Sequence, residues 1–258
     1  MTIPPARIDS IYRYPLKGLS PERLESSLLS IGQTIPADRI YAIENGPCGF
    51  DPAVPAYFPK QRFLMLMRNE RLARLDTRID ETSHILSIRS DGREVVRGDL
   101  RTEAGRTAIE SFFASFCADE LRGPPKILYA AGHSFSDVAK KVVSVINLAS
   151  VAAVETAIGA PVDPLRFRAN LYVTGWPAWH EFELLDRVVA VGHGVELKIV
   201  KRIVRCAATN VEPRSGIRDL AIPETLLRTF GHSDCGVYGE VIAAGTVSVG
   251  DAITPVTR

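Results

Sequence analysis

The sequence predicts a β-rich α+β protein made of two domains, 1–122 and 123–258. Short runs rich in β-branched and aromatic residues recur along the chain, and turns rich in Gly, Pro, Asn or Asp separate them. The Arg-Gly-Pro-Pro-Lys segment at 122–126 is the strongest boundary signal in the chain. The short strands and Gly turns of the segment 235–251 are typical of a β-barrel that closes on itself.

The predicted strands of the N-terminal half are 7–14, 24–31, 38–43, 72–76 and 84–89. The Pro-rich segment 51–59 is expected to be irregular, and 60–66 fits either a helix or a strand. The segment 90–93, Ser-Asp-Gly-Arg, predicts a hairpin turn. The spacing of the apolar residues in 107–117 predicts an amphipathic helix.

The predicted strands of the C-terminal half are 127–131, 142–146, 171–174, 188–192 and 195–204. Asn147, or alternatively Ser150, is suited to cap a helix that runs to about residue 158. Gly159 then stands where glycine is favoured at a helix C-terminus. Pro223 fits the first turn of a short helix over 223–230.

Composition and charge exclude several classes of protein. The chain has 258 residues, of which 46% are hydrophobic and 24% charged, as in a globular protein with a sizeable core. A net charge of +1 gives no reason to expect a nucleic acid or a membrane surface as a partner. The four cysteines form no C-x-x-C pair, which argues against a zinc cluster and a disulfide scaffold. Because no signal peptide or membrane span is evident, we expect a cytoplasmic protein with reduced thiols.

Cys206 is the residue around which the candidate chemistry gathers. It follows the predicted strand 195–204 and stands close to Lys201, Arg202 and Arg205 in the sequence. Cationic neighbours favour the thiolate form of a cysteine, which binds metals and attacks electrophiles. The alternative is that Cys206 is a small buried apolar residue, as most isolated cysteines are.

Other cations also stand at the ends of predicted strands. Lys17 lies between Pro and Gly in a turn that suits either an anion or a plain hairpin. Arg166 and Arg168 are expected to point the same way from a strand, as a surface pair or as a phosphate site. Together, Lys17, Arg39, Arg168 and Cys206 suit an anionic cofactor that carries a soft metal. The P-loop, nucleophile-elbow and H-E-x-x-H motifs are absent.

Six short motifs follow one another along almost the whole chain. They are Tyr-Pro-Leu-Lys-Gly at 14–18, Asp-Arg-Ile-Tyr at 38–41, Lys-Gln at 60–61, Phe-Ser-Asp at 135–137, Phe-Arg-Ala-Asn-Leu at 167–171 and Arg-Cys-Ala-Ala-Thr at 205–209. Their order resembles that of MOSC-domain proteins with the matching N-terminal β-barrel domain. Within these, the chain is most similar to the molybdenum-containing reductases of N-hydroxylated compounds, the mitochondrial amidoxime-reducing components and their bacterial relatives.

The resemblance implies an N-terminal β-barrel-like domain followed by a MOSC β-barrel domain with a few short helices. It implies that molybdenum cofactor binds between them, with Cys206 as the metal ligand and a catalytic residue, and Asp137 as the nearest candidate for proton handling. The substrate would be a small N-hydroxylated compound, and a separate redox protein would supply the electrons. Pyridoxal phosphate is not expected. The implied cofactor-binding residues are Lys17, Gly18, Arg39, Ser136, Arg168, Asn170, Arg205 and Cys206.

Several positions depart from the family pattern. Gly18 stands in place of the usual Ser, Lys60 in place of Arg, and Ala169 in place of Pro, and the loop at 138–140 lacks the usual small hydroxyl residues and Pro. Two alternatives therefore stay open. One is a sulfur-carrier or transferase protein that uses a persulfide of Cys206, and the other is a molybdopterin-binding module without turnover.

Overall fold

Seven strands form a closed β-barrel in the computed structural model, which describes residues 5–256. Their order around the barrel is β10-β9-β13-β12-β11-β15-β1, and pairing of β1 with β10 closes it. The pairing is antiparallel except between β9 and β10. The strands are β1 (Ala6–Arg13), β9 (Val143–Asn147), β10 (Leu171–Thr174), β11 (Val188–Val191), β12 (Val195–Val204), β13 (Asp234–Ala243) and β15 (Ala252–Pro255). The predicted β-rich α+β class is confirmed.

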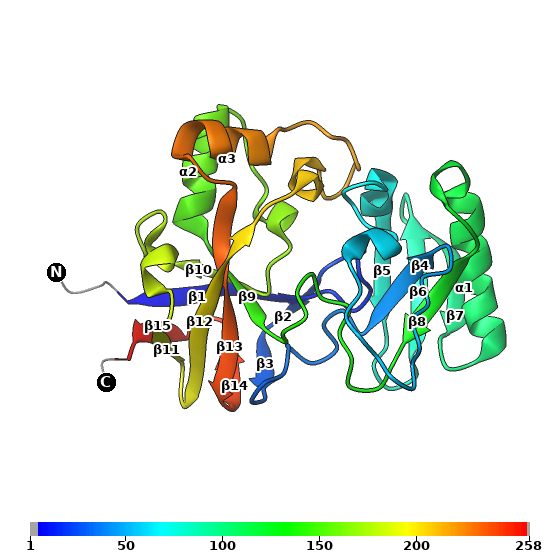
Figure 1. Ribbon diagram of the computed structural model, residues 1–258, viewed down its shortest axis with the longest axis horizontal. Helices are drawn as coiled ribbons and strands as arrows, with labels where there is room; N and C mark the ends of the chain where they lie inside the picture. Colours follow the sequence, from blue (N-terminus) through cyan, green and yellow to red (C-terminus); the bar gives the residue numbers. More distant parts are fainter. Residues whose placement is uncertain (1–4, 257–258) are drawn as a thin grey trace.

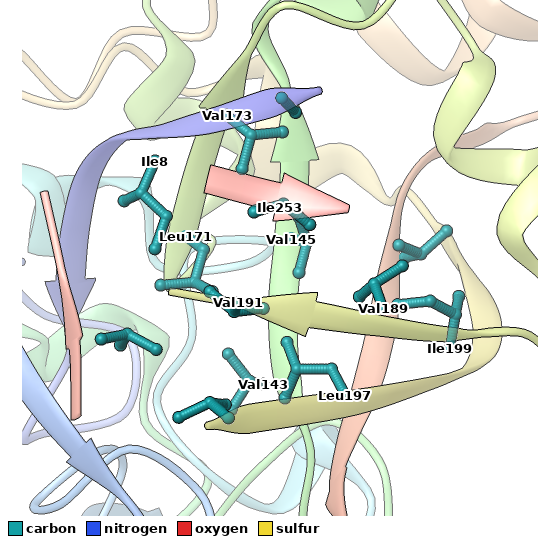
Figure 2. Packing of buried hydrophobic residues seen from close by; sticks show 14 of the residues in the cluster. Ile8, Val143, Val145, Leu171, Val173, Val189, Val191, Leu197, Ile199 and Ile253 are labelled. Atoms are coloured by element: carbon teal, nitrogen blue, oxygen red, sulfur yellow. The ribbon is translucent and has the colours of Figure 1, made fainter. Parts of the chain in front are cut away.

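The barrel interior is filled by the inward-facing residues of every strand (Figure 2). On β12, Val195, Leu197 and Ile199 are buried while Lys198 between them is exposed, as period-two alternation requires. Full burial of each such side chain contributes roughly 1.5–3 kcal/mol relative to exposure. The packed core therefore makes the barrel a rigid support for the side chains at the ends of its strands.

Two helices cover one outer side of the barrel (Figure 1). In α2 (Leu148–Ile158), the Asn147 side chain caps the N-terminus by accepting from Ala149 N at 3.1 Å, and Gly159 ends the helix at φ 75°. Both predictions are confirmed. Helix α3 (Ile222–Phe230) begins with Pro in its first turn, also as predicted. In place of the expected strand 24–31 there are two short strands. Strand β2 (Glu22–Leu24) pairs antiparallel with β1, and β3 (Ser26–Leu29) pairs with β14 (Gly245–Ser248).

A second body lies beside the barrel and has its own core (Figure 1). It contains the pair β4 (Tyr41–Asn45) and β8 (Pro125–Tyr129), and the antiparallel sheet β5 (Leu75–Ile79), β6 (Ile85–Ser90) and β7 (Arg93–Asp99). The predicted hairpin turn joins β6 to β7. Helix α1 (Glu103–Phe116) covers the predicted segment 107–117 except its last residue, Cys117, which is the C-cap, and it buries Ile109 and Phe113 in this core.

The chain passes between the two bodies more than twice. Strand β1 belongs to the barrel, and Leu16 and Leu19 then pack in the core of the second body. Strands β2 and β3 return to the barrel side, where they pair with β1 and β14, and the chain enters the second body again at β4. Strand β8 follows the Pro-Pro segment but pairs with β4, and the chain returns to the barrel only at β9. The connecting segments 14–19 and 130–142 run side by side between the bodies. Lys17 Nζ donates to Phe135 O, and Arg39 links the two segments, because Arg39 N donates to Tyr14 O and Arg39 O accepts from Phe135 N.

Three local predictions were wrong. The strand expected over 38–43 begins only at Tyr41, because Arg39 adopts a left-handed conformation with φ 54°. Residues Glu70–Arg74 form the 3-10 helix η2, so the strand expected at 72–76 starts at Leu75. Arg166 lies in the 3-10 helix η4 (Pro164–Phe167) and Arg168 ends it with φ 52°, so these two arginines do not alternate along a strand.

The remaining 3-10 helices are short: η1 (Lys60–Arg62), η3 (Ala118–Glu120), η5 (His180–Leu184) and η6 (Ala207–Asn210). Within residues 5–256, no helix combines the length and the apolar character needed to cross a membrane.

Candidate functional site

A cavity of about 270 Å³ lies between the barrel and the second body. All nine residues that the sequence predicted as site residues line it, and they come from both bodies and both connecting segments. They are Lys17, Gly18, Arg39, Ser136, Asp137, Arg168, Asn170, Arg205 and Cys206. The structure therefore brings together residues that are up to about 190 positions apart in the sequence.

Cys206 lies two residues after the end of β12 and is the N-cap of the 3-10 helix η6. Its carbonyl oxygen accepts from Thr209 N and from Thr209 Oγ1, both at 3.0 Å, which holds the backbone around the thiol. Its side chain is partly exposed. Lys60 Nζ, from η1 in the second body, lies 3.1 Å from Cys206 Sγ. The thiol is therefore reachable from the cavity and already has a cationic partner.

Lys60 is a further residue of the site, which the motifs did not predict to bind the cofactor. Burial acts to lower the pKa of the Lys60 ammonium, but Asp137 and Cys206 outweigh it, so that the pKa is raised. Lys60 thus carries its charge at neutral pH. The sequence feature that could have identified Lys60 as a site residue is its position in the motif at 60–61, where the family usually has Arg.

Arg205 braces the cavity wall from behind. Its Nε and Nη2 donate to the carbonyl oxygen of Cys235 at 2.8 and 2.5 Å, and its Nη1 donates to that of Phe167 at 2.8 Å. The guanidinium also lies 5.3 Å from the centre of the Phe167 ring. Because these bonds join the start of β13 to η4, Arg205 fixes the position of Arg168 relative to Cys206.

Lys17 and Asp137 form an ion pair across the two connecting segments. Lys17 Nζ lies 2.5 Å from Asp137 Oδ1 and 2.8 Å from the carbonyl oxygen of Phe135. Burial acts to raise the pKa of Asp137, but Lys17, Lys60 and Arg39 hold it well below its usual range. Burial lowers the pKa of Lys17, which Asp137 opposes. The Lys17 side chain is 6% exposed and that of Asp137 51% exposed, so the carboxylate faces the cavity.

Arg39 and Arg168 lie over the same aromatic ring, that of Tyr14, at 4.8 and 4.3 Å from its centre. Arg39 pairs with Asp38 and donates from Nη2 to the carbonyl oxygen of Arg168 at 2.9 Å. Burial lowers the pKa of Arg168, and Arg39 acts in the same direction. Two crowded guanidinium groups at a cavity wall repel each other, and a bound anion would relieve that repulsion.

Three hydrogen bonds to the protein hold the side chain of Asn170. Its Oδ1 accepts from Ser144 N at 3.1 Å and Ser144 Oγ at 2.8 Å, and its Nδ2 donates to the carbonyl oxygen of Tyr12 at 3.1 Å. Ser136 Oγ shares a 2.9 Å hydrogen bond with Ser134 Oγ. Asn170, which precedes β10, therefore holds β1, β9 and the start of β10 together at the cavity.

Gly18 has φ 83°, and a Cβ added to it would lie 3.1 Å from the carbonyl oxygen of Leu64. A serine in this backbone conformation would be strained. The left-handed backbone conformation therefore explains why a glycine occupies this position of the motif.

The cavity is strongly cationic. Eight of its lining residues are Lys or Arg, and two are Asp. Within the described part of the chain, no group of three or more His, Cys, Asp or Glu is placed to hold a metal ion. A metal at Cys206 would therefore need further ligands from a bound molecule, and the cations would suit an anionic one.

The comparisons with known proteins agree with these motifs. The MOSC N-terminal beta barrel domain matches residues 5–123, and the MOSC domain matches residues 130–254. The chain is a MOSC-domain protein. This MOSC protein is distantly similar to the mitochondrial amidoxime-reducing components.

Two curated relatives match part of the chain. Mitochondrial amidoxime reducing component 2 of Bos taurus is 29% identical over 43% of this chain, and mitochondrial amidoxime-reducing component 1 of Xenopus laevis is 30% identical over 45%. The chain spans 36% of the length of each relative.

Solved structures also match. The YUAD protein of Bacillus subtilis aligns over 96% of this chain and 94% of its own, with 12% identity and a TM-score of 0.46. YiiM of Escherichia coli aligns over 45% of this chain and 54% of its own, with 18% identity and a TM-score of 0.34.

Proposed function

We propose that this protein is a molybdenum cofactor-dependent oxidoreductase that reduces N-hydroxylated compounds with electrons from a separate redox protein. The observation that carries the proposal is the meeting of Cys206 with cations from both bodies in one cavity. The similarity to amidoxime-reducing components supports the substrate class.

The residues present fit the proposed cofactor. Cys206 would ligate the metal, and Lys17, Arg39 and Arg168 would hold the phosphate, because charge-assisted hydrogen bonds from such cations favour phosphate oxygens. The bound cofactor would supply a metal that changes its oxidation state by two electrons. Reduction of N–OH to N–H consumes two electrons and two protons and releases one water.

The protein's own groups would prepare this reaction. Arg205 and Asn170 would keep the cavity walls in place through their bonds to backbone atoms. Asp137 would act as a carboxylate at neutral pH, because neighbouring cations lower its pKa. In that form it has no proton to donate and is a weak base, so its role in proton handling would be to accept a hydrogen bond from the group that delivers the proton and to orient that group.

Replacement of the ligand tests the proposal. We expect Cys206→Ser to lose bound molybdenum and the reduction of an aryl amidoxime together. Cys48→Ser is the matched control, since Cys48 is a free, partly buried cysteine away from the cavity. Elemental analysis measures the metal in protein from a cofactor-producing host. Full activity of Cys206→Ser would contradict the proposal.

One contact favours a second candidate, a sulfur carrier. Lys60 Nζ at 3.1 Å from Cys206 Sγ could equally stabilise a persulfide anion. Intact-protein mass spectrometry would then find a reducible adduct of one sulfur atom on Cys206 and no bound metal.

A further inference from the structure

The cavity contains more positive charge than the proposed cofactor would use. Of the eight lining cations, three are assigned to the phosphate. Two others are engaged by the protein, since Arg166 pairs with Asp219 at 2.8 Å and Arg205 donates to backbone carbonyls. Lys60, Lys201 and Arg202 remain.

These three residues form a wall of the cavity that we call the basic wall. Lys60 contacts Cys206, and Lys201 and Arg202 lie on β12, the strand that leads to Cys206. Lys201 is exposed, and within residues 5–256 its ammonium makes no hydrogen bond or ion pair. The Arg202 guanidinium lies 4.3 Å from the centre of the Phe182 ring, and its Nε is buried without a partner.

The acidic residues of the cavity are already occupied. Asp137 is 2.5 Å from Lys17. Asp38 pairs with Arg39 and accepts from Tyr14 N at 2.8 Å. Each of these two carboxylates already has a cationic partner, so a cationic ligand would have to compete with Lys17 or Arg39 for it.

We propose that the basic wall, Lys60, Lys201 and Arg202, binds a negatively charged group of the substrate. This inference rests on the proposed function, and it narrows the substrates to N-hydroxylated compounds that carry a carboxylate or a comparable anion. Within residues 5–256, none of these three cations forms an ion pair with a carboxylate, although Lys60 contacts Cys206 and Arg202 lies over the Phe182 ring. An anionic substrate therefore gains attraction from them, whereas a cationic one is repelled. Lys60, Lys201 and Arg202 are thus specificity-determining residues.

Alkylation of Cys206 in metal-free protein measures the charge of the cavity without any activity. Iodoacetate and iodoacetamide form the same S–C bond as iodide leaves, and they differ mainly in the negative charge of the first. Peptide mass spectrometry gives the rate at Cys206 alone. We expect the iodoacetate-to-iodoacetamide rate ratio at Cys206 to be about five times the ratio for glutathione in the same buffer. A single partly exposed contact between opposite charges has an effect of about this size.

Two comparisons make this result specific. Raising the ionic strength from about 0.01 to 1 M should remove most of the preference, because it shortens the screening length from roughly 30 to 3 Å. Lys201→Gln should lower the ratio about threefold. Lys198→Gln, which removes an exposed lysine of the same strand outside the cavity, should leave it unchanged. A ratio equal to that of glutathione, or equal effects of both variants, would overturn the proposal.

Turnover separates this inference from the proposed function. Cofactor-loaded protein is assayed with an aryl amidoxime and with its carboxylate-bearing and ammonium-bearing analogues. We expect kcat/KM to be about tenfold or more higher for the carboxylate than for the ammonium compound, and Lys201→Gln to reduce that ratio. Equal kcat/KM values would overturn the inference while the proposed function stands. Failure to reduce any of the three would overturn the proposed function, and the alkylation ratio would still decide the charge preference of the wall.

Discussion

Removal of the Arg205 guanidinium should destabilise the fold considerably, because this side chain joins three segments of the MOSC barrel. The substitution Arg205→Met keeps an unbranched side chain and removes all three hydrogen bonds to the carbonyl oxygens of Cys235 and Phe167. A hydrogen bond from a charged group contributes roughly 1.5–3 kcal/mol. Since the three bonds share one guanidinium, we expect a total loss of about 3 kcal/mol rather than their full sum.

For a chain of this size, each kcal/mol shifts the midpoint of thermal unfolding by roughly 2–4 °C, so the expected decrease is about 6–12 °C. Circular dichroism during heating measures it. Arg228→Met is the control, because Arg228 is an exposed arginine on α3 away from the cavity. Arg205→Lys should restore less than half of the loss, since one ammonium cannot reproduce the planar fork of donors. A midpoint for Arg205→Met equal to that of Arg228→Met would refute the assignment of Arg205 as a brace.

Two further predictions follow from the site. Gly18→Ser should lower the free energy of unfolding by about 1–3 kcal/mol in urea titrations, because φ is 83° and the new Cβ would press on Leu64 O; an unchanged midpoint would contradict this. Asp137 has a folded-state pKa below its ordinary 3.8, so its stabilising contribution is present above that value and is lost as pH falls through the lowered pKa. Wild type should therefore be more stable than Asp137→Asn at pH 7, and the difference should shrink below about pH 4; a difference that does not change between pH 7 and pH 2 would count against it.

Much of the fold follows from local signals. The alternation in 195–204 gives β12, and Asn147 and Gly159 mark both ends of α2, because these signals depend on a few neighbouring residues. The left-handed conformation of Arg39 has no such signal. It depends on distant partners, since Arg39 N donates to Tyr14 O and Arg39 O accepts from Phe135 N.

The candidate site shows the same division. The motifs identified the nine residues, and the structure places all of them at one cavity. The motifs did not reveal that Lys60 contacts Cys206, because the two residues are 146 positions apart and belong to different bodies. Nor did they separate residues that face a ligand from residues such as Asn170, whose side chain is held by three hydrogen bonds to the protein.

The position of β1 has a consequence for how this protein could be divided in the laboratory. A cut at the Pro-Pro segment would separate β1 from β10 and β15, its neighbours in the barrel, and β8 from β4. Each fragment would then expose unpaired strand edges, which favour aggregation. A self-sufficient barrel fragment would require Ala6–Arg13 to be grafted next to β15, as in a circular permutation. Protein engineering of the two bodies must therefore treat them as interlocked parts of one folding unit.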